Sequence, residues 1–151
     1  MVVVQGEGPK TCDLAIVGEA PDGNDTMFKR PCAGNPGDVT NTTLHRVGLA
    51  RQSCYITHAV KVRPGTLRSL TSWDGELADI PEEARTFKKR GKGPDDIDIL
   101  WRGERPHPQL IWWRDKLLEE LESINTNVIV AMGGTALWAL TGQSQIGKWR
   151  G

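Results

Sequence analysis

Residues 12–17 (CDLAIV) and the turn Gly18-Glu19-Ala20-Pro21 that follows them decide the fold. The apolar run has the length of a buried strand, and a glycine at its end is typical of a strand that leads into a turn. We therefore expect a strand there, followed by a loop over residues 20–25, where proline, glycine and asparagine interrupt any regular period. Residues 54–60 and 127–132 are two further apolar runs rich in β-branched side chains, so we expect three buried strands.

Helical patterns separate these predicted strands. Residues 38–49 permit a helix through the spacing of four side chains, Val39, Thr43, Leu44 and Val47. A longer helix is predicted from Gln109, because apolar side chains recur there at helical spacing, at Leu110, Trp113, Leu117, Leu121 and Ile124. Residues 135–141 form a short predicted helix with Gly142 as its C-cap. Alternating strands and helices predict an α/β fold with a parallel sheet that helices cover on both faces.

The segment 65–108 shows no such period, because proline, glycine and charged residues interrupt it throughout. It is too long for an ordinary connection, so it is a functional insertion, a partly disordered segment or a minor subdomain. A chain of 151 residues fits one domain. We expect a single domain over residues 1–151 with an irregular insertion at about 65–108.

Composition excludes several classes of protein. Nineteen basic side chains balance nineteen acidic ones, so any contact with nucleic acid depends on local patches. Three cysteines, an odd number without metal-ligand spacing, argue against a disulfide framework and fit a reducing, cytoplasmic environment. No stretch approaches the roughly 18 apolar residues of a membrane span, so no membrane partner is expected.

Polar residues collect where the predicted strands end. In an open parallel sheet, ligands bind outside the carboxyl ends of the strands. The turn at 18–21 follows the first strand, Arg30-Pro31-Cys32-Ala33-Gly34 comes shortly after it, and residues 55–64 contain the second strand and its end. These three segments predict a pocket, and the basic residues beside it, Lys61, Arg63 and Arg68, are candidates for binding DNA.

Four motifs in this order resemble the family 4 uracil-DNA glycosylases of bacteria and archaea. They are the turn at 18–21, the Arg-Pro-X-X-Gly pattern at 30–34, the Tyr-Ile-Thr-X-X-Val-Lys-X-Arg-Pro pattern at 55–64 and the Val-Ile-Val-Ala-Met-Gly run at 128–133. The resemblance extends over residues 18–64 and 109–151. It implies a three-layer α/β/α fold with a central parallel sheet of four strands, and an enzyme that flips a base out of DNA to hydrolyse its glycosidic bond.

The resemblance also implies roles for individual residues. Glu19 matches the acid of the first motif and Asp25 a second acid six residues later, and either can orient the attacking water. A carboxylate just after a strand also often caps the following turn, so a structural role stays open for both. Gly18, Ala20 and Pro21 complete the part of the pocket that faces the base.

Two departures from the family lie in the pocket itself. The phenylalanine that stacks on the flipped uracil is replaced by Cys32, and the asparagine that reads the edge of the base is replaced by His58. A neutral imidazole donates at one nitrogen and accepts at the other, but with a different reach from an amide. We expect a different base preference, with His58 lining the pocket and serving as a candidate general acid, since imidazole exchanges protons near neutral pH.

Two further departures concern the cofactor and the end of the chain. The family carries a four-cysteine iron–sulfur cluster, but this chain has Val62 and Trp113 at two of the ligand positions and no cysteine pair before the first strand. We therefore expect no cluster, no metal and no other cofactor. The family continues beyond Arg150-Gly151 into a strand and a His-Pro-Ser segment, so the chain is either a fragment or a natural short relative.

Three hypotheses on function follow. The first is a DNA glycosylase that releases uracil or a modified pyrimidine, in base-excision repair or phage replication. The second is an inactive member that binds DNA or a replication protein such as a DNA polymerase, because related domains occur fused to phage DNA polymerases. The third is a hydrolase of free nucleosides or nucleotides. Salt-sensitive DNA binding separates the first two hypotheses from the third.

Overall fold

The computed structural model describes residues 2–64, 108–143 and 146–148, and the expected insertion at about 65–108 falls almost wholly outside them. Within the described residues, no helix is long and apolar enough to cross a membrane.

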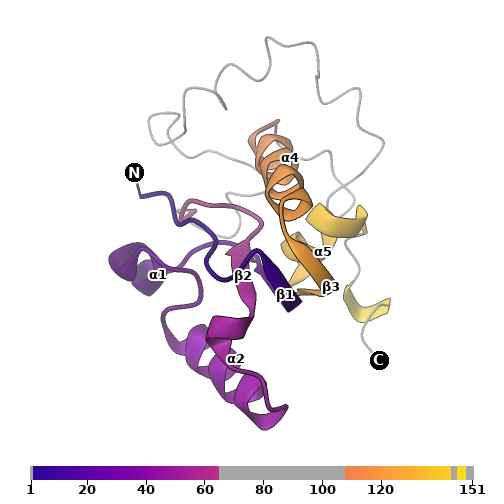
Figure 1. The fold of residues 1–151 in the computed structure, drawn as a ribbon. Helices are drawn as coiled ribbons and strands as arrows, with labels where there is room; N and C mark the ends of the chain where they lie inside the picture. Colours follow the sequence, from indigo (N-terminus) through magenta and orange to yellow (C-terminus); the bar gives the residue numbers. More distant parts are fainter. Residues whose placement is uncertain (1, 65–107, 144–145, 149–151) are drawn as a thin grey trace.

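Three parallel strands form the sheet of the described residues (Figure 1). They are β1 (Thr11–Gly18), β2 (Tyr55–His58) and β3 (Asn125–Ala131), in the spatial order β2-β1-β3. The three predicted strands and their parallel arrangement are confirmed. Because β1 lies in the centre, its carboxyl end at Gly18 is paired directly with His58 at the end of β2.

Helices cover both faces of this sheet, which confirms the three-layer α/β/α architecture (Figure 1). On one face lie α4 (Pro108–Glu122) and α5 (Gly134–Thr141), and on the other lies α2 (Asn35–Arg46). The short helix α1 (Gly23–Phe28) follows β1, and the 3-10 turn η1 (Arg51–Ser53) precedes β2. A second 3-10 turn, η6, covers Ile146–Lys148.

Two hydrophobic cores reflect the alternation of side chains along β1. Val17 points into the core beneath α4 and α5, where it joins Leu117 and Trp138. Its neighbour Ile16 points the other way, into a core with Ile56 and Leu44 of α2. The periodicity that predicted α4 is confirmed, because Leu110, Trp113, Leu117 and Leu121 are all buried in the first core. Ile124, which follows the helix, is buried in a separate cluster with Ala15 and Tyr55.

Three details of the sequence prediction are wrong. The expected loop at 20–25 contains the start of α1, because Asp22 and Asp25 form a capping box that stabilises a single short helix. Helix α2 covers Asn35–Arg46 and not residues 38–49. Val39 in the helix and Val47 at its C-cap are exposed, although the prediction had used both as apolar positions.

The third error concerns β3, which is not buried as predicted. It is an edge strand of the described sheet, and Val128, Ile129 and Val130 are 53%, 42% and 39% exposed. The fourth strand that the family resemblance implies is not among the described residues.

The segment before β1 runs along β2. Val4 donates its backbone N–H to the carbonyl of Lys61, and Glu7 exchanges two backbone hydrogen bonds with Ile56. These contacts fix the backbone of Glu7 beside the start of β2.

Candidate active site

His58 ends β2 and lies against the end of β1. Its side chain is 5% exposed, and its ring lies so close to Gly18 that a Cβ on this glycine would approach Nδ1 to 2.5 Å. The glycine of the first motif is therefore required by the close approach of the imidazole ring.

Asp25 binds the other side of the His58 ring. Its Oδ2 lies 2.9 Å from Nε2 of His58, and its Oδ1 accepts a hydrogen bond of 2.6 Å from the backbone N–H of Ala33. Asp22 adds a weaker backbone N–H contact of 3.3 Å from within the capping box. Asp25 and the nearby 30–34 loop thus meet His58, which lies 33 positions after Asp25 in the sequence.

These contacts determine the charge of Asp25. Burial raises the pKa of its carboxyl group, but the hydrogen bonds from His58 and Ala33 outweigh burial and leave the pKa below its ordinary value. An ionised Asp25 requires a proton on Nε2 of His58, since a carboxylate only accepts hydrogen bonds. Nδ1 is then the ring atom left for another partner, and it has none among the described residues.

Glu19 approaches from the opposite side of the strand ends. Its Oε1 accepts a hydrogen bond of 2.8 Å from the backbone N–H of Thr135 at the start of α5. Gly133 permits this contact, because it has a positive φ of 103° and a Cβ there would lie 2.5 Å from Cγ of Glu19. The sequence prediction placed Thr135 at the start of a helix but not in the site, although the adjacent glycines Gly133 and Gly134 were a visible signal.

The carboxylate of Glu19 keeps one oxygen available. No hydrogen bond joins Oε2 to any of the described residues, and the side chain is only partly buried. Of the two predicted acids, Asp25 has most of its acceptor sites occupied, whereas Glu19 is anchored by one oxygen and can present the other to a water molecule.

Cys32 lies beneath the site rather than in an open pocket. It is 4% exposed and packs with Ile16 and Ile56 in the core on the α2 side. Its backbone has a positive φ of 51°, which is unusual for a residue with a side chain. Burial, with a smaller contribution from the charge of Asp25, raises the pKa of the thiol to about 11, so Cys32 stays protonated at neutral pH.

The remaining predicted pocket residues, Ala20 and Pro21, follow Glu19 along the chain. Ala20 is partly buried against the core beneath α4 and α5, and Pro21 is buried.

The three predicted DNA-binding residues have different surroundings. Lys61 is buried and its ammonium pairs with Glu120 of α4 at 2.5 Å, so it does not project from the surface. Arg63 is exposed, and its guanidinium lies over Gly23, at the start of α1. Arg68 lies outside the described residues.

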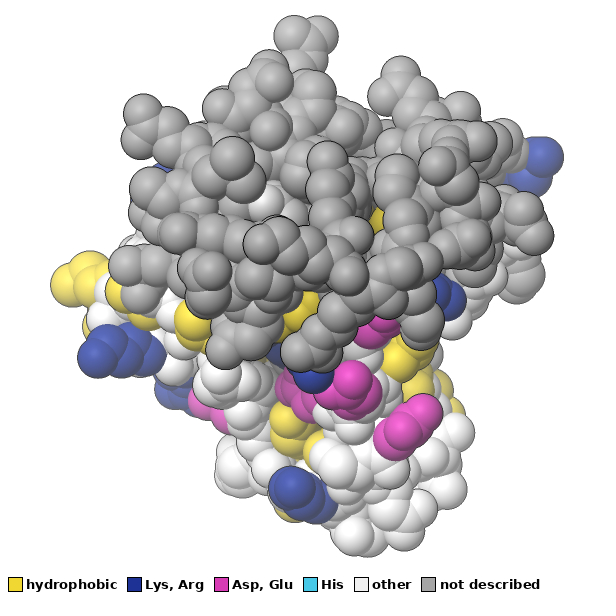
Figure 2. Space-filling view, turned by 90° about the horizontal axis from the view of Figure 1, so that it is seen from above, with side chains coloured by type: hydrophobic (Ala, Val, Ile, Leu, Met, Phe, Trp, Pro, Cys, Tyr) yellow, Lys and Arg dark blue, Asp and Glu magenta, His cyan; other side chains and the backbone are white. Residues whose placement is uncertain are grey.

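The charge on the visible face gives no single basic surface. Lys and Arg side chains of the described residues are scattered over the face in Figure 2, and Asp and Glu side chains lie between them. This distribution agrees with the expectation that any contact with DNA depends on individual cations near the site.

No group of three or more His, Cys, Asp or Glu side chains in the described part of the chain is arranged to hold a metal ion. All three cysteines are free, and they divide between two cores: Cys32 and Cys54 lie on the α2 side, and Cys12 packs against a separate cluster. Val62 and Trp113, which stand at two ligand positions of the resembling family, are 3% and 4% exposed in the core beneath α4.

Comparisons with known proteins agree with these motifs. The family model of the Uracil DNA glycosylase superfamily matches residues 5–150. The Type-4 uracil-DNA glycosylase of Archaeoglobus fulgidus is 29% identical over 130 residues, 86% of this chain and 48% of that protein. Its counterpart from Thermotoga maritima is 30% identical over 135 residues, 89% of this chain and 52% of that protein. The chain thus spans about half the length of these two relatives.

Proposed function

Because the chain belongs to the uracil-DNA glycosylase superfamily, we propose that it releases uracil or a modified pyrimidine from DNA by hydrolysing the bond between base and sugar. One observation carries this proposal. Glu19, with one carboxylate oxygen available, and the buried Asp25–His58 pair meet at the carboxyl ends of β1 and β2, where a parallel sheet binds its ligand.

The reaction needs few groups. The bond from the sugar carbon to the base nitrogen breaks, and its electron pair leaves with the base. A water oxygen bonds to the sugar carbon, and the water gives up one proton. Glu19 orients this water through Oε2 and accepts the proton, while its Oε1 stays fixed to the N–H of Thr135.

His58 forms the wall on the base side. Asp25 fixes the ring so that Nε2 carries a proton and Nδ1 faces Gly18. Nδ1 is buried against Gly18, so a base contacts it only when the turn at 18–21 moves away from the ring. A neutral ring then offers Nδ1 as an acceptor to the edge of the base, and a charged ring offers it as a donor to the leaving base. The choice of target base follows from this single contact atom, because an amide at the same position would offer a donor and an acceptor together.

DNA is the proposed partner, and Arg63 is the described cation best placed to contact a phosphate near the flipped nucleotide. Arg63 is exposed, and its guanidinium lies over Gly23 at the start of α1, four residues after Glu19. Lys61 is not proposed as a phosphate contact, since its charge is already paired with Glu120 in the interior.

We further propose that the protein works without an iron–sulfur cluster. The residues present do not fit one, because Val62 and Trp113 offer no thiolate and fill their positions with packed hydrophobic side chains. Iron and sulfide analysis of protein purified without oxygen tests this directly. We expect far less than one iron atom and one sulfide ion per chain. Amounts that correspond to one cluster per chain would contradict the proposal.

A second function is favoured by the position of Cys32. It contributes to the core and not to a surface on which a base can stack. An inactive member would use the same fold to bind DNA or a replication protein such as a DNA polymerase, in a phage replication setting.

The proposal is tested with single- and double-stranded oligonucleotides that carry uracil, 5-hydroxymethyluracil, hypoxanthine or no lesion. Abasic sites are scored by alkaline cleavage, and free nucleosides are assayed in parallel. Release of one pyrimidine from DNA supports the glycosylase. Salt-sensitive binding without release supports the inactive module, and hydrolysis of free nucleosides alone overturns both.

A further inference from the structure

We propose that Arg51 is a positioning residue, which holds the backbone of the 30–34 loop so that this loop orients Asp25 and, through it, His58. This inference rests on the proposed function, because Arg51 would support the residues of the same candidate active site.

Arg51 binds two successive carbonyl groups of the loop. Its side chain is 14% exposed, and its Nη1 donates to the carbonyl of Cys32 at 3.1 Å while Nη2 donates to that of Pro31 at 2.5 Å. Nη1 also contacts Oδ1 of Asn41 in α2 at 3.2 Å. A guanidinium suits this task because its donors are held in a rigid planar fork, whereas an ammonium is a single point charge.

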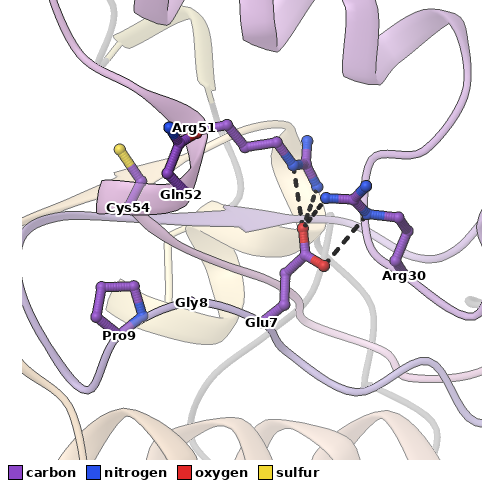
Figure 3. Close-up of a pocket in the computed structure, with 7 residues that line it drawn as sticks. All are labelled: Glu7, Gly8, Pro9, Arg30, Arg51, Gln52 and Cys54. Atoms are coloured by element: carbon purple, nitrogen blue, oxygen red, sulfur yellow. Dashed lines mark hydrogen bonds and ion pairs between the residues drawn. The ribbon is translucent and has the colours of Figure 1, made fainter.

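Glu7 also binds the guanidinium, along its Nε–Nη2 edge (Figure 3). Its Oε1 accepts hydrogen bonds from Nε and Nη2 of Arg51 at 3.0 and 2.6 Å. The backbone of Glu7 is itself fixed to β2 by two hydrogen bonds with Ile56, at 2.9 and 2.8 Å. The pocket around these groups has a volume of about 420 Å³, and both arginines point into it toward the same carboxylate.

The charge of Glu7 is preserved in this position. Burial raises the pKa of its carboxyl group, but hydrogen bonds from Arg30 and Arg51 outweigh burial and lower the pKa overall. Arg51 is therefore held by a permanent negative charge at neutral pH.

The two bound carbonyls come directly before the amide that Asp25 uses. Cys32 has left-handed backbone geometry, a conformation that persists in a residue with a side chain only when its surroundings fix it. The next residue, Ala33, donates its N–H to Asp25 at 2.6 Å. If Arg51 releases the carbonyls, Cys32 can relax, and the Ala33 amide then turns away from Asp25, which loses its shortest hydrogen bond.

Arg30 provides a matched control. It also binds Glu7, through Nε at 3.2 Å and Nη2 at 2.8 Å, but within the described residues it contacts no carbonyl of the 30–34 loop through its side chain. Its side chain is 49% exposed. Arg30→Gln therefore removes one of the two arginines from Glu7 and leaves the contacts of Arg51 with the Pro31 and Cys32 carbonyls in place.

The test compares Arg51→Lys and Arg30→Gln by nuclear magnetic resonance. Lysine keeps the charge and can pair with Glu7 but cannot span both carbonyls. We expect Arg51→Lys to move the Ala33 amide proton toward the position of a weakly bonded amide and to mix the two tautomers of His58, seen in its ring nitrogen shifts. Arg30→Gln leaves both signals in place. Wild-type signals in a folded Arg51→Lys protein overturn the proposal.

Base release by the same proteins is the second readout. We expect Arg51→Lys to lower the single-turnover rate by about 10-fold or more, because displacement of a site by about an ångström can cost about 100-fold. If the wild type releases no base but Arg51→Lys still moves the two signals, the proposed function fails and the positioning role stands. If Arg51→Lys does not fold, Asn41→Ala is the second variant, because it removes the Oδ1 acceptor of Nη1 of Arg51. We expect it to shift the Ala33 amide and His58 ring signals by a smaller amount. Unchanged signals in Asn41→Ala also overturn the proposal.

Discussion

By the resemblance in sequence, Cys32 and His58 replace the stacking and edge-reading residues of the family, and the structure gives the two side chains different surroundings. His58 takes part in the site through Asp25, whereas Cys32 is enclosed by Ile16, Ile56 and Leu44. The two family residues therefore cannot be restored with equal ease.

The variant His58→Asn is expected to shift base preference toward plain uracil, since an amide offers a donor and an acceptor at once. Cys32→Phe is expected to destabilise the protein by about 1–3 kcal/mol, because the larger side chain overpacks a filled core. Rates on uracil and 5-hydroxymethyluracil check the first statement, and urea unfolding checks the second. A flat uracil rate in His58→Asn would refute the assignment of His58 to the base.

The acid sensitivity of the fold is a second prediction at the level of one residue. The pKa of Asp25 lies below its ordinary value of 3.8 in the folded state, so its ionised form stabilises the native protein. This contribution is complete above about pH 4 and is lost as the pH falls through the lower, folded value.

Asp25→Asn should therefore unfold more easily than the wild type at pH 7, by about 2 kcal/mol, because the hydrogen bonds to a charged acceptor are lost. The difference between the two proteins should shrink below pH 4. Urea midpoints at pH 7 and pH 3 measure it, and an equal difference at both values would contradict the assigned charge state.

At the level of elements, a buried polar network joins the end of β2 to α4. The Lys61 ammonium pairs with Glu120 at 2.5 Å, and Glu120 also accepts hydrogen bonds from the hydroxyl groups of Tyr55 and Thr57 at 2.8 and 2.9 Å. Burial lowers the pKa of Lys61 and the charge of Glu120 partly opposes this effect. The lysine of the third motif thus connects two layers of the fold.

Lys61→Met should destabilise the protein by about 3 kcal/mol, since it leaves Glu120 without its buried counter-charge. Lys116→Met is the matched control, on the helix that carries Glu120. Lys116 is exposed, and its one ion pair within the described residues is with Glu119, one turn away. We expect the control to change the free energy of unfolding by less than about 0.5 kcal/mol. Equal effects of the two variants in urea unfolding would contradict the role of this pair.

Elements with a regular apolar period were predictable from the sequence, and elements fixed by local hydrogen bonds or distant partners were not. Helix α4 was predicted because its buried side chains repeat every three or four residues. Helix α1 was missed because it is only six residues long, too short to show an apolar period. It depends instead on the Asp22–Asp25 capping box. The exposure of β3 was missed because an apolar run looks the same at an edge and in the centre of a sheet.

The candidate site was predictable in a similar, partial way. The motifs identified Glu19, Asp25 and His58, which do meet at the strand ends. No sequence pattern indicated that Asp25 would hold His58, or that Glu7 and Arg51, 44 positions apart, would support the loop between them. Such pairings arise only when the sheet brings β2 beside β1 and the segment before it.

For the whole molecule, DNA binding should depend on few cations, because the protein has no net charge and its basic side chains are scattered on the visible face. Arg63→Gln is expected to reduce the slope of log affinity against log salt by about 0.7–0.9, the contribution of one phosphate contact. Lys116→Met, an exposed cation on α4, serves as a matched loss of charge and should leave the slope unchanged. Equal slopes for Arg63→Gln and wild type would remove Arg63 from the DNA interface.

In the proposed function, the sheet and the start of α5 together place Glu19 to direct water at the sugar carbon of a flipped nucleotide. Glu19→Gln is the sharpest variant, because glutamine Oε1 can still accept the hydrogen bond from Thr135 while the negative charge is lost.

The most direct measurement is the single-turnover rate of base release from uracil- and 5-hydroxymethyluracil-containing single strands by the wild type and Glu19→Gln. We predict release of one of these bases by the wild type and a rate lowered by about 10-fold or more in Glu19→Gln, with DNA affinity retained. Equal rates in the two proteins would exclude Glu19 as the group that directs the water, and no release by the wild type from either strand would exclude glycosylase activity on these bases.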